Sequence, residues 1–412
     1  MLLKAKVIGC GAGGNKAVIE LIEAGVIDKV NTILVNSTIK DIPEEYHSIS
    51  IVLSQDASEG CGKERDRAKK LVANAINNGT LDLDGFIEKD TDLTILIAST
   101  EGGTGSGSVP LIASYIRNYI DTTDDYEEDD EEYFRANVHV IGLKGFGIDG
   151  RAYQNTIEFF KDIEEVFTVE CIDNSKFLEE SRGSRPKAEE LANKELCRRV
   201  STLLGLNYVD TKQNIDKKDQ YKAVNMPGYT TVEHYDLTDK IKNINEFNEI
   251  CIAMVDNSKS ISISDTQKRL AVILNIPKAS ESYIDYDFNV LKERLGYPYE
   301  VFTQLQYSED TKQDPYIELI SSGMNMPIEE LERLFEEYKE ASSKVNKSQD
   351  SFFEYMKNIQ GNSEDSMFNG DIKTPHKPKK DKAAFLADFT SKSKRKSEPT
   401  KEVKQNNKTD KF

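Results

Sequence analysis

Two glycine-rich segments, each between an apolar run and a helical pattern, constrain the fold of this 412-residue chain more than any other feature. The first is Gly9-Cys-Gly-Ala-Gly-Gly-Asn15, and the second is Thr100-Glu-Gly-Gly-Thr-Gly-Ser-Gly-Ser108. Glycine lets a backbone bend so that consecutive amides face one anion, and the missing Cβ lets a phosphate approach closely. Two such turns in one sheet can close on a polyphosphate from two sides.

Short apolar runs alternate with helical spacing through the first 180 residues. The runs that we expect to be buried strands cover residues 7–8, 32–35, 49–53, 93–98 and 138–143. Strand, glycine-rich turn and helix in repeated order predict an α/β fold, with a Rossmann-like parallel sheet and helices on both faces. Ligands of such sheets bind at the carboxyl ends of the strands.

The rest of the chain predicts a long helix at about 187–206 and then a second α/β region with a mixed sheet. In that region we expect strands at 250–254, 299–306 and 316–320 and a helix near 265–274. Pro327 opens another long helix, because proline suits the first helical position. The apolar positions of this helix need a partner surface, either the chain's own body or a neighbouring subunit. The expected parts are a first domain at 1–186, a central linking helix at 187–213, a second domain at 214–325, a long C-terminal helix at 326–360 and a disordered tail at 361–412.

Charge is divided unevenly along the chain. Residues 373–412 hold 13 Lys and Arg against 5 Asp and Glu, a net charge of +8, so residues 1–372 carry −26 of the total of −18. An acidic body repels nucleic-acid backbones, so direct DNA binding by the body is not expected. The tail is either a docking segment for an acidic partner or a solubilising extension. The segment 121–132 holds nine acids in twelve residues and is expected to be a solvated loop.

Five scattered cysteines without a Cys-x-x-Cys pair predict reduced thiols, and no zinc site. No apolar run is long enough for a signal peptide or a membrane span, so we expect a cytoplasmic protein without direct membrane contact.

The third notable segment is Asn214-Ile-Asp-Lys-Lys-Asp219, in which paired carboxylates could polarise a water molecule. The first glycine-rich segment also fits a dinucleotide fold, which leaves an NAD-binding dehydrogenase as an alternative. That fold wants an acid at the end of its second strand, where this chain has Asn36-Ser37. A Walker-type ATPase is not indicated, because the sequence has no G-x-x-x-x-G-K-[ST] run.

Together these segments resemble the tubulin family, which includes the bacterial proteins FtsZ and TubZ. The run Glu101 to Gly107 is similar to the signature G-G-G-T-G-[ST]-G, with Glu101 in place of the first glycine. The run Asn214 to Asp219 resembles the N-x-D-x-x-[DE] loop that follows the core helix. The resemblance extends from residue 4 to about residue 360. The long helix from Pro327 and the basic tail are more similar to TubZ than to FtsZ or eukaryotic tubulin.

The resemblance implies a GTPase that binds GTP or GDP with magnesium. It assigns the phosphate cradle to Gly9, Cys10, Gly11, Ala12, Asn15, Gly102, Gly103, Thr104, Gly105, Ser106 and Gly107. It assigns a second nucleotide loop to Asn36 and the loop that senses the γ-phosphate to Gly60, Cys61, Gly62 and Lys63. It assigns the ribose side to Asp149 and Arg151, and guanine recognition to Asn174 and Asn193. Glu189 stands where an aromatic residue of the family often stacks on guanine.

The resemblance also implies a reaction shared between subunits. The acidic loop, with Asn214, Asp216 and Asp219 as its catalytic residues, would enter the nucleotide pocket of the next subunit, so that hydrolysis occurs only in a head-to-tail filament. Such a filament would segregate plasmid or phage DNA through a DNA-bound adaptor held by the tail. The alternative is a phage cytoskeletal filament that positions DNA or particles without an adaptor.

Overall fold

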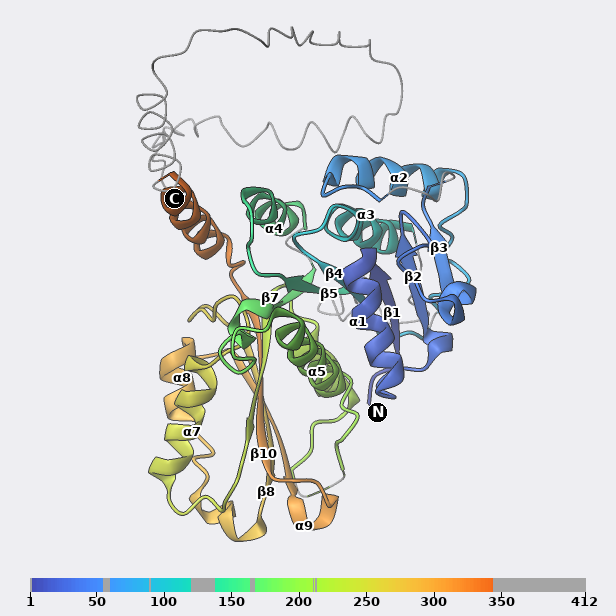
Figure 1. The fold of residues 1–412 in the computed structure, drawn as a ribbon. Helices are drawn as coiled ribbons and strands as arrows, with labels where there is room; N and C mark the ends of the chain where they lie inside the picture. The colour runs from blue at the N-terminus through green and yellow to red at the C-terminus, as the bar shows by residue number, and fades with distance from the viewer. Residues whose placement is uncertain are drawn as a thin grey trace, which may run out of the picture. The chain divides into compact units, whose positions relative to one another are not determined.

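In the computed structural model, residues 2–54, 60–88, 90–119, 138–163, 167–209, 211 and 213–343 are described. They form a ten-stranded sheet in the order β3-β2-β1-β4-β5-β6-β7-β10-β8-β9 (Figure 1). The strands are β1 (Ala5–Cys10), β2 (Thr32–Asn36), β3 (Ser50–Val52), β4 (Leu93–Ser99), β5 (Val138–Lys144), β6 (Thr168–Asp173), β7 (Gly228–Asp236), β8 (Arg269–Ile276), β9 (Glu300–Tyr307) and β10 (Tyr316–Met324). The α/β fold class and the expected strands of the first half are confirmed.

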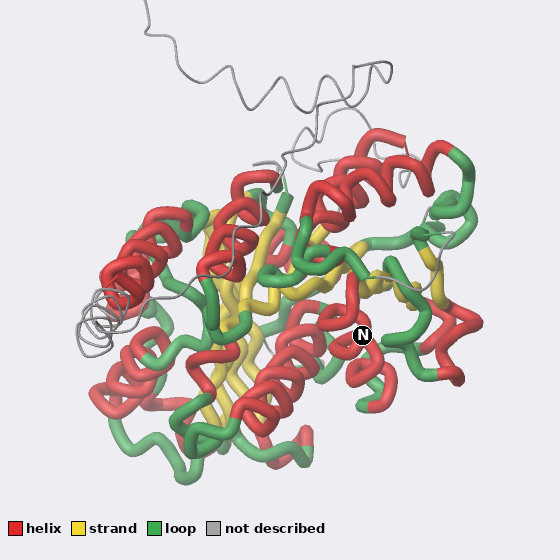
Figure 2. Tube along the Cα trace, turned by 45° about the horizontal axis from the view of Figure 1, so that its top comes forward, coloured by secondary structure: helices red, strands yellow, loops and turns green. Residues whose placement is uncertain are grey.

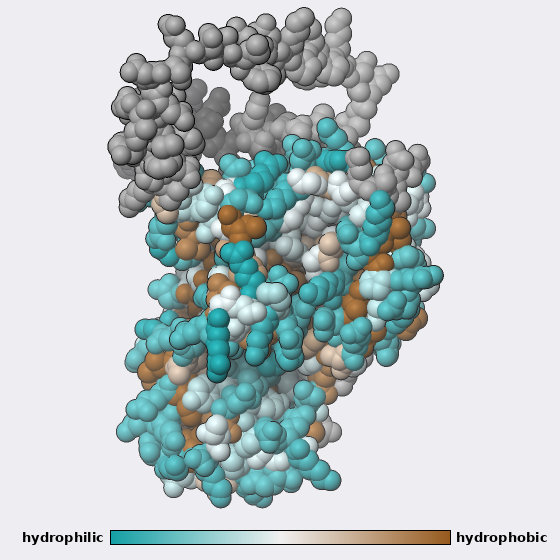
Figure 3. Space-filling view, in the orientation of Figure 1, coloured by the Kyte–Doolittle hydropathy of each residue, from teal (hydrophilic) through white to brown (hydrophobic). Residues whose placement is uncertain are grey.

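Helices cover both faces of the first half of this sheet (Figure 2). One apolar core cluster joins α1 (Gly11–Glu23) and α5 (Arg185–Leu203) to inward-facing residues of β1 and β4. On the other face, α3 (Thr104–Tyr119) packs against α2 (Arg65–Asn77) and α4 (Gly150–Asp162). Hydrophilic side chains dominate the surface drawn in Figure 3, as expected of a chain with 31% charged residues.

The second half continues the same sheet. β6 pairs with β7 in parallel, from Thr168 opposite Gly228, so the two expected sheets are joined edge to edge. β10 runs antiparallel to both β7 and β8, which gives the mixed sheet that the sequence predicted. The remaining helices of this half are α6 (Lys217–Val224), α7 (Ile244–Asp256), α8 (Asn289–Leu295) and α9 (Ser308–Thr311). The domain boundaries stay predictions.

Two expected elements of this half were wrong. Residues 250–254 lie in α7 and not in a strand, because Asn243 caps this helix by accepting a bond from the Glu246 amide at 3.0 Å, and Phe247, Cys251 and Met254 then fall on one buried face. The expected helix near 265–274 is replaced by β8, whose eight residues are all buried. A short continuous apolar run fits a buried strand and a buried helix equally well, so periodicity could not separate the two.

A further helix at 328–343 follows Pro327, as predicted. It packs on α4 of the same chain, since the ring of Tyr153 stacks on Phe335 at 5.9 Å and meets Tyr338 at 5.2 Å between centroids. Its described part therefore uses the chain's own body as its partner surface. Residues 344–360, the tail at 361–412 and the acidic segment at 121–132 lie outside the described residues. No helix within the described ranges has the length and apolarity needed to cross a bilayer.

Candidate functional site

The two glycine-rich segments meet at one edge of the sheet, which we call the carboxyl edge because the parallel strands end there. β1 and β4 are neighbours, and Cys10 lies opposite Ala98. A Cβ atom on Gly105 would lie 2.4 Å from the carbonyl oxygen of Cys10, and one on Gly11 would lie 2.7 Å from the amide nitrogen of Gly105. The loops pack backbone against backbone, and only glycine permits this approach.

Two further segments join these loops. A Cβ atom on Gly103 would lie 2.8 Å from the Cα atom of Lys63, so the segment 60–64 rests directly on the second glycine-rich loop. At the end of β2, the hydroxyl of Ser37 is 3.0 Å from that of Thr104. The predicted phosphate cradle, the segment with Gly60, Cys61 and Gly62, and the end of β2 are therefore one continuous surface.

The two asparagines predicted beside this cradle are both buried. Asn15 donates from Nδ2 to the carbonyl of Val35 at 3.3 Å, and its Oδ1 has no hydrogen-bond partner among the described residues. Asn36 accepts from the amide of Ser37 at 2.9 Å and donates to Asp41 at 3.3 Å. A buried oxygen without a partner is rare in folded proteins, and Asn15 therefore fits a site completed by a ligand.

The first turn of α4 holds the segment 60–64 from the side. Asp149 caps this helix by accepting a bond from Ala152 at 2.9 Å, and its second oxygen accepts one from Lys63 Nζ at 2.6 Å. The hydrogen bond from Lys63 lowers the pKa of the Asp149 carboxyl, with help from the Ala152 amide. Arg151 donates from Nε to the carbonyl of Lys63 at 3.4 Å. The predicted ribose-side residues thus contact the predicted γ-phosphate loop.

Two buried side chains that sequence reasoning missed also fasten these loops. Asn155 of α4 donates from Nδ2 to the carbonyls of Lys63 and Glu101, both at 3.0 Å. Arg65, at the start of α2, donates to the carbonyl of Ser106 at 3.0 Å and to Asp162 at 2.6 Å. The bonds of Asn155 join residues at least 53 positions apart, so no local motif marked it, whereas Arg65 directly follows the segment 60–64 and could have been noticed.

Glu101, which stands in place of the first glycine of the signature, points toward the loop between β5 and α4. Its Oε1 accepts a bond from the amide of Gly147 at 2.8 Å, and a Cβ atom on Gly145 would lie 2.5 Å from its Oε2. Burial raises the pKa of this carboxyl. The loop between β5 and α4 therefore holds the carboxylate, and the packing of Gly103 and Gly105 is undisturbed.

The predicted base-reading residues lie on the α5 face. Asn174 begins the short helix η3 (Asn174–Phe177), which packs against α5, and its Oδ1 is buried without a hydrogen-bond partner among the described residues. Asn193 is a partly exposed residue of α5. One turn earlier, Glu189 pairs at 3.7 Å with Lys16 of α1, directly after Asn15. The α5 side of the site is therefore next to the start of α1.

The acidic loop lies at the opposite edge, the amino edge, where the parallel strands begin. Asp216 caps α6 by accepting a bond from the Asp219 amide at 2.8 Å, and the following Lys217 pairs at 2.8 Å with Asp92, directly before β4. The seven residues of β4, at about 3.3 Å each, place this loop roughly 20 Å from the second glycine-rich loop. Asn214 accepts a bond from the Thr211 amide at 2.7 Å within the loop.

Burial, followed by the charge of Asp216, raises the pKa of the Asp219 carboxyl. The structure therefore does not bring Asn214, Asp216 and Asp219 together with the cradle of the same chain.

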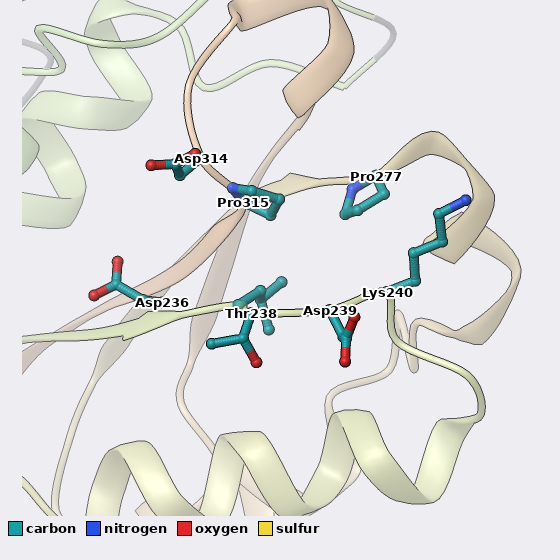
Figure 4. Close-up of a pocket in the computed structure, with 8 residues that line it drawn as sticks. Asp236, Thr238, Asp239, Lys240, Pro277, Asp314 and Pro315 are labelled. Atoms are coloured by element: carbon teal, nitrogen blue, oxygen red, sulfur yellow. The ribbon is translucent and has the colours of Figure 1, made fainter.

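A separate cavity of about 660 Å³ lies where β7 ends and β10 begins (Figure 4). Its lining consists of Asp236, Leu237, Thr238, Asp239, Lys240, Pro277, Asp314 and Pro315. It contains none of the residues that the sequence predicted for the site.

Known proteins resemble the chain in sequence and in fold, although no family model matches it. TubZ of Clostridium botulinum C phage is 23% identical over 337 residues, which cover 81% of this chain and 84% of TubZ. The mitochondrial division protein fszB of Dictyostelium discoideum is 24% identical over 245 residues, 58% of this chain and 57% of fszB. The crystal structure of Clostridium botulinum phage c-st TubZ superimposes with a TM-score of 0.62 at 17% identity, over 84% of this chain and 100% of that chain. The chain is thus similar in sequence to tubulin-like proteins, and it has the fold of the solved TubZ.

Another tubulin-like protein is similar in fold. The GTPγS-bound protofilament of CetZ2 from Haloferax volcanii gives a TM-score of 0.63 at 17% identity, over 84% of this chain and 100% of that chain. The chain spans about half the length of several curated relatives that it matches, 57% for fszB and 53% for CetZ1. The resemblance to tubulin-like proteins and the expected fold are confirmed, while the roles of individual site residues stay predictions.

Proposed function

We propose that this chain is a GTPase that assembles head to tail and hydrolyses GTP only where two copies meet. The observation that carries the proposal is the division of the site between two edges of one sheet. The glycine loops occupy the carboxyl edge, and Asp216 and Asp219 occupy the amino edge. A copy stacked with its amino edge on the carboxyl edge of another would complete the site. Head-to-tail contacts that do not close on themselves produce filaments.

The carboxyl edge supplies the groups that a guanine nucleotide needs. Backbone amides and the amino ends of α1 and α3 attract the phosphates. The buried Oδ1 atom of Asn174 could accept a hydrogen bond from the N–H groups of guanine. Among the described residues, no group of three His, Cys, Asp or Glu side chains is placed to hold a metal ion. A magnesium ion would therefore be held chiefly by the phosphates and by water, as is common for this ion.

The amino edge supplies the base. Hydrolysis requires a group that orients a water molecule and accepts its proton, and the carboxylate of Asp219 from the next copy would do this. The raised pKa of Asp219 makes it a stronger base than an ordinary aspartate. Asp216 adds negative charge beside it and fixes the start of α6, and Asn214 holds the loop through Thr211.

Solved relatives support self-association. The similar structures include a GTPγS-form protofilament of TubZ from Bacillus thuringiensis serovar israelensis and a two-stranded filament of TubZ-Bt. The test for this chain is the dependence of GTP turnover on protein concentration. Turnover per chain should rise steeply as copies begin to assemble. A turnover number that stays constant from dilute to concentrated protein would exclude hydrolysis between copies.

Nucleotide identity is tested separately by thermal unfolding with GTP and with NAD. A ligand that binds only the folded chain raises its melting temperature by mass action. We expect GTP to raise it and NAD to leave it unchanged.

We further propose that the filaments act in the cytoplasm and move plasmid or phage DNA through an adaptor protein. The support is the contrast between the −26 body and the +8 tail, together with the similarity to TubZ of a phage. All five cysteines are free thiols, which is compatible with a reducing compartment. Removing residues 361–412 should spare assembly and abolish binding to a DNA-bound adaptor. If cargo positioning survives this truncation, the alternative of a filament without an adaptor is favoured.

A further inference from the structure

Glu101 joins two loops of the carboxyl edge. Its backbone carbonyl, in the second glycine-rich loop, accepts a bond from Asn155 Nδ2 at 3.0 Å. Its side chain reaches the loop at 145–149 between β5 and α4, where Oε1 accepts a bond from the Gly147 amide at 2.8 Å. A Cβ atom on Gly145 would lie 2.5 Å from Oε2, so the same carboxylate also fills the space beside this glycine. Glu101 therefore belongs to the cradle by its backbone and contacts the neighbouring loop with its side chain.

The loop at 145–149 has few backbone hydrogen bonds of its own. Among the described residues, no other amide of residues 146–148 has a hydrogen-bond acceptor, and the side chain of Ile148 is exposed. Gly147 has a φ angle of +59°, and a Cβ atom there would lie 2.6 Å from the ring of Tyr153. The bond to Glu101 is thus the hydrogen bond that fixes the middle of this loop.

The position of the loop matters because it leads into the predicted ribose side of the site. It ends at Asp149, which caps α4 through the Ala152 amide at 2.9 Å, and Arg151 lies in the first turn of that helix. A ligand binds only those molecules in which the binding loop is in place, so a bond that holds the loop raises the apparent affinity.

The charge of Glu101 has the opposite effect on a nucleotide. A carboxylate repels phosphate groups, and the repulsion is stronger where water is partly excluded. Burial raises the pKa of Glu101, while the Gly147 amide and the charge of Lys144 act in the other direction. Removing the side chain would therefore strengthen nucleotide binding if repulsion were its main effect, and would weaken binding if holding the loop were.

We propose that Glu101 is a positioning residue for the nucleotide: its carboxylate holds the loop at 145–149 against the second glycine-rich loop and keeps Asp149 and Arg151 in place for the ribose. The proposal rests on the proposed function of GTP binding. Holding the loop outweighs the repulsion between Glu101 and the phosphates. Because GTP and GDP have the same ribose, the effect is equal for both nucleotides.

The first test measures the affinities of the full chain for GTPγS and GDP, with the protein kept dilute so that copies do not assemble. Glu101→Ala should lower both affinities alike, by about threefold to tenfold, because fewer molecules have the loop in place. Glu101→Gln keeps an oxygen that can accept the Gly147 bond, so it should restore the wild-type affinities. Unchanged or tighter binding by Glu101→Ala, or an equal loss in Glu101→Gln, would overturn the proposal.

The matched control is Glu309→Ala on α9, outside the site. The Glu309 carboxylate also accepts a bond from a backbone amide of another segment, that of Lys278 at 3.0 Å. This control should leave both affinities unchanged.

The second test is hydrogen exchange of the chain without nucleotide. In Glu101→Ala, exchange within 145–149 should be about threefold to tenfold faster, while β4 keeps its wild-type protection and shows that the variant is folded. Glu101→Gln should exchange at the wild-type rate. Equal exchange of the loop in Glu101→Ala and the wild type would contradict the proposal whatever the affinities are. If the wild type binds neither GTPγS nor GDP, the proposed function itself fails, and the exchange rates still decide whether Glu101 holds the loop.

Discussion

The two edges of the sheet differ in the types of residue that form them. The cradle at the carboxyl edge is formed mainly by glycines and buried amide groups, with the ion pair of Lys63 and Asp149 beside it and Glu101 turned toward Gly147. The amino edge around α6 is charged and carries Asp216, Lys217 and Asp219. A carboxylate placed beside phosphates repels them, so carboxylates such as Asp216 and Asp219 inside the phosphate cradle would oppose the binding of GTP. Separation lets each edge keep its own chemistry, and the proposed site would then be complete only between two copies.

The largest effect is expected at the amino edge. Asp219→Asn should lower GTP turnover about 10²- to 10⁴-fold, because it removes the proposed base, and should leave GTP affinity unchanged. Asp216→Ala should likewise bind GTP and give stable, slowly hydrolysing filaments. The control is Glu249→Gln, an exposed acid on the outer side of α7, which should hydrolyse at the wild-type rate. Wild-type turnover in Asp216→Ala and in Asp219→Asn would mean that the amino edge is not catalytic.

Mixing two inactive variants tests the division of the site directly. Asp219→Asn keeps an intact carboxyl edge, and Gly105→Val keeps an intact amino edge but blocks the cradle. At an interface between the two, the carboxyl edge of the first meets the amino edge of the second, so the mixture should hydrolyse GTP faster than the sum of the two variants measured separately. Turnover of the mixture that merely equals the sum of the two would place the whole site within one copy.

The carboxyl edge should be sensitive to a single methyl group, depending on its position. Gly105→Ala introduces a Cβ atom 2.4 Å from the Cys10 carbonyl, whereas a Cβ atom on Gly102 meets nothing closer than 4.0 Å. We expect Gly105→Ala to lower the free energy of unfolding by about 1–3 kcal/mol, the usual cost of overpacking. Gly102→Ala should change it by less than about 0.5 kcal/mol. Urea unfolding of the two variants measures the difference, and equal losses would contradict the close packing of the loops.

The dependence of GTP turnover on pH should reflect the pKa of Asp219 at the amino edge. The pKa of Asp219 is raised by burial and by the charge of Asp216. A base must be deprotonated, so turnover should be full above this raised pKa and fall as the pH drops through it, at a higher pH than for an ordinary aspartate. Glu300→Gln removes a nearby negative charge and should shift the acid limb slightly to lower pH. An acid limb that moves to higher pH would exclude Asp219 as the base.

The smallest effect is expected in the helix at 328–343, which packs on α4. Tyr153→Leu removes ring contacts with Phe335 and Tyr338, worth about 1 kcal/mol. Hydrogen exchange should speed up within 328–343, while the glycine loops keep their protection. Faster exchange in both regions would show that the helix and the carboxyl edge open together.

Much of the first half could be predicted because its signals are local. The seven-residue run of β4 and each glycine-rich segment can be recognised from consecutive residues. The carboxyl ends of parallel strands lie at one edge of a sheet, which predicts that the segments meet there. The second half gave weaker signals: β8 is a continuous apolar run without alternation, and the cap at Asn243 was not recognised. The role of Asn155 could not be assigned, because its partners are distant in sequence, whereas Arg65 could have been noticed from its place directly after the segment 60–64. Likewise, only the fold shows that Glu101 turns toward Gly147.

β4 connects the two halves of the proposed reaction. Its first end is tied to the acidic loop by Lys217 and Asp92, and its last residue leads into the second glycine loop. In the proposed filament, the length of this strand would contribute to the axial distance between the acids and the phosphates of one copy. Two residues inserted into β4 would lengthen the subunit by about 7 Å along that axis. Copies with and without the insertion would then differ in pitch, and a filament could accept only one length of subunit.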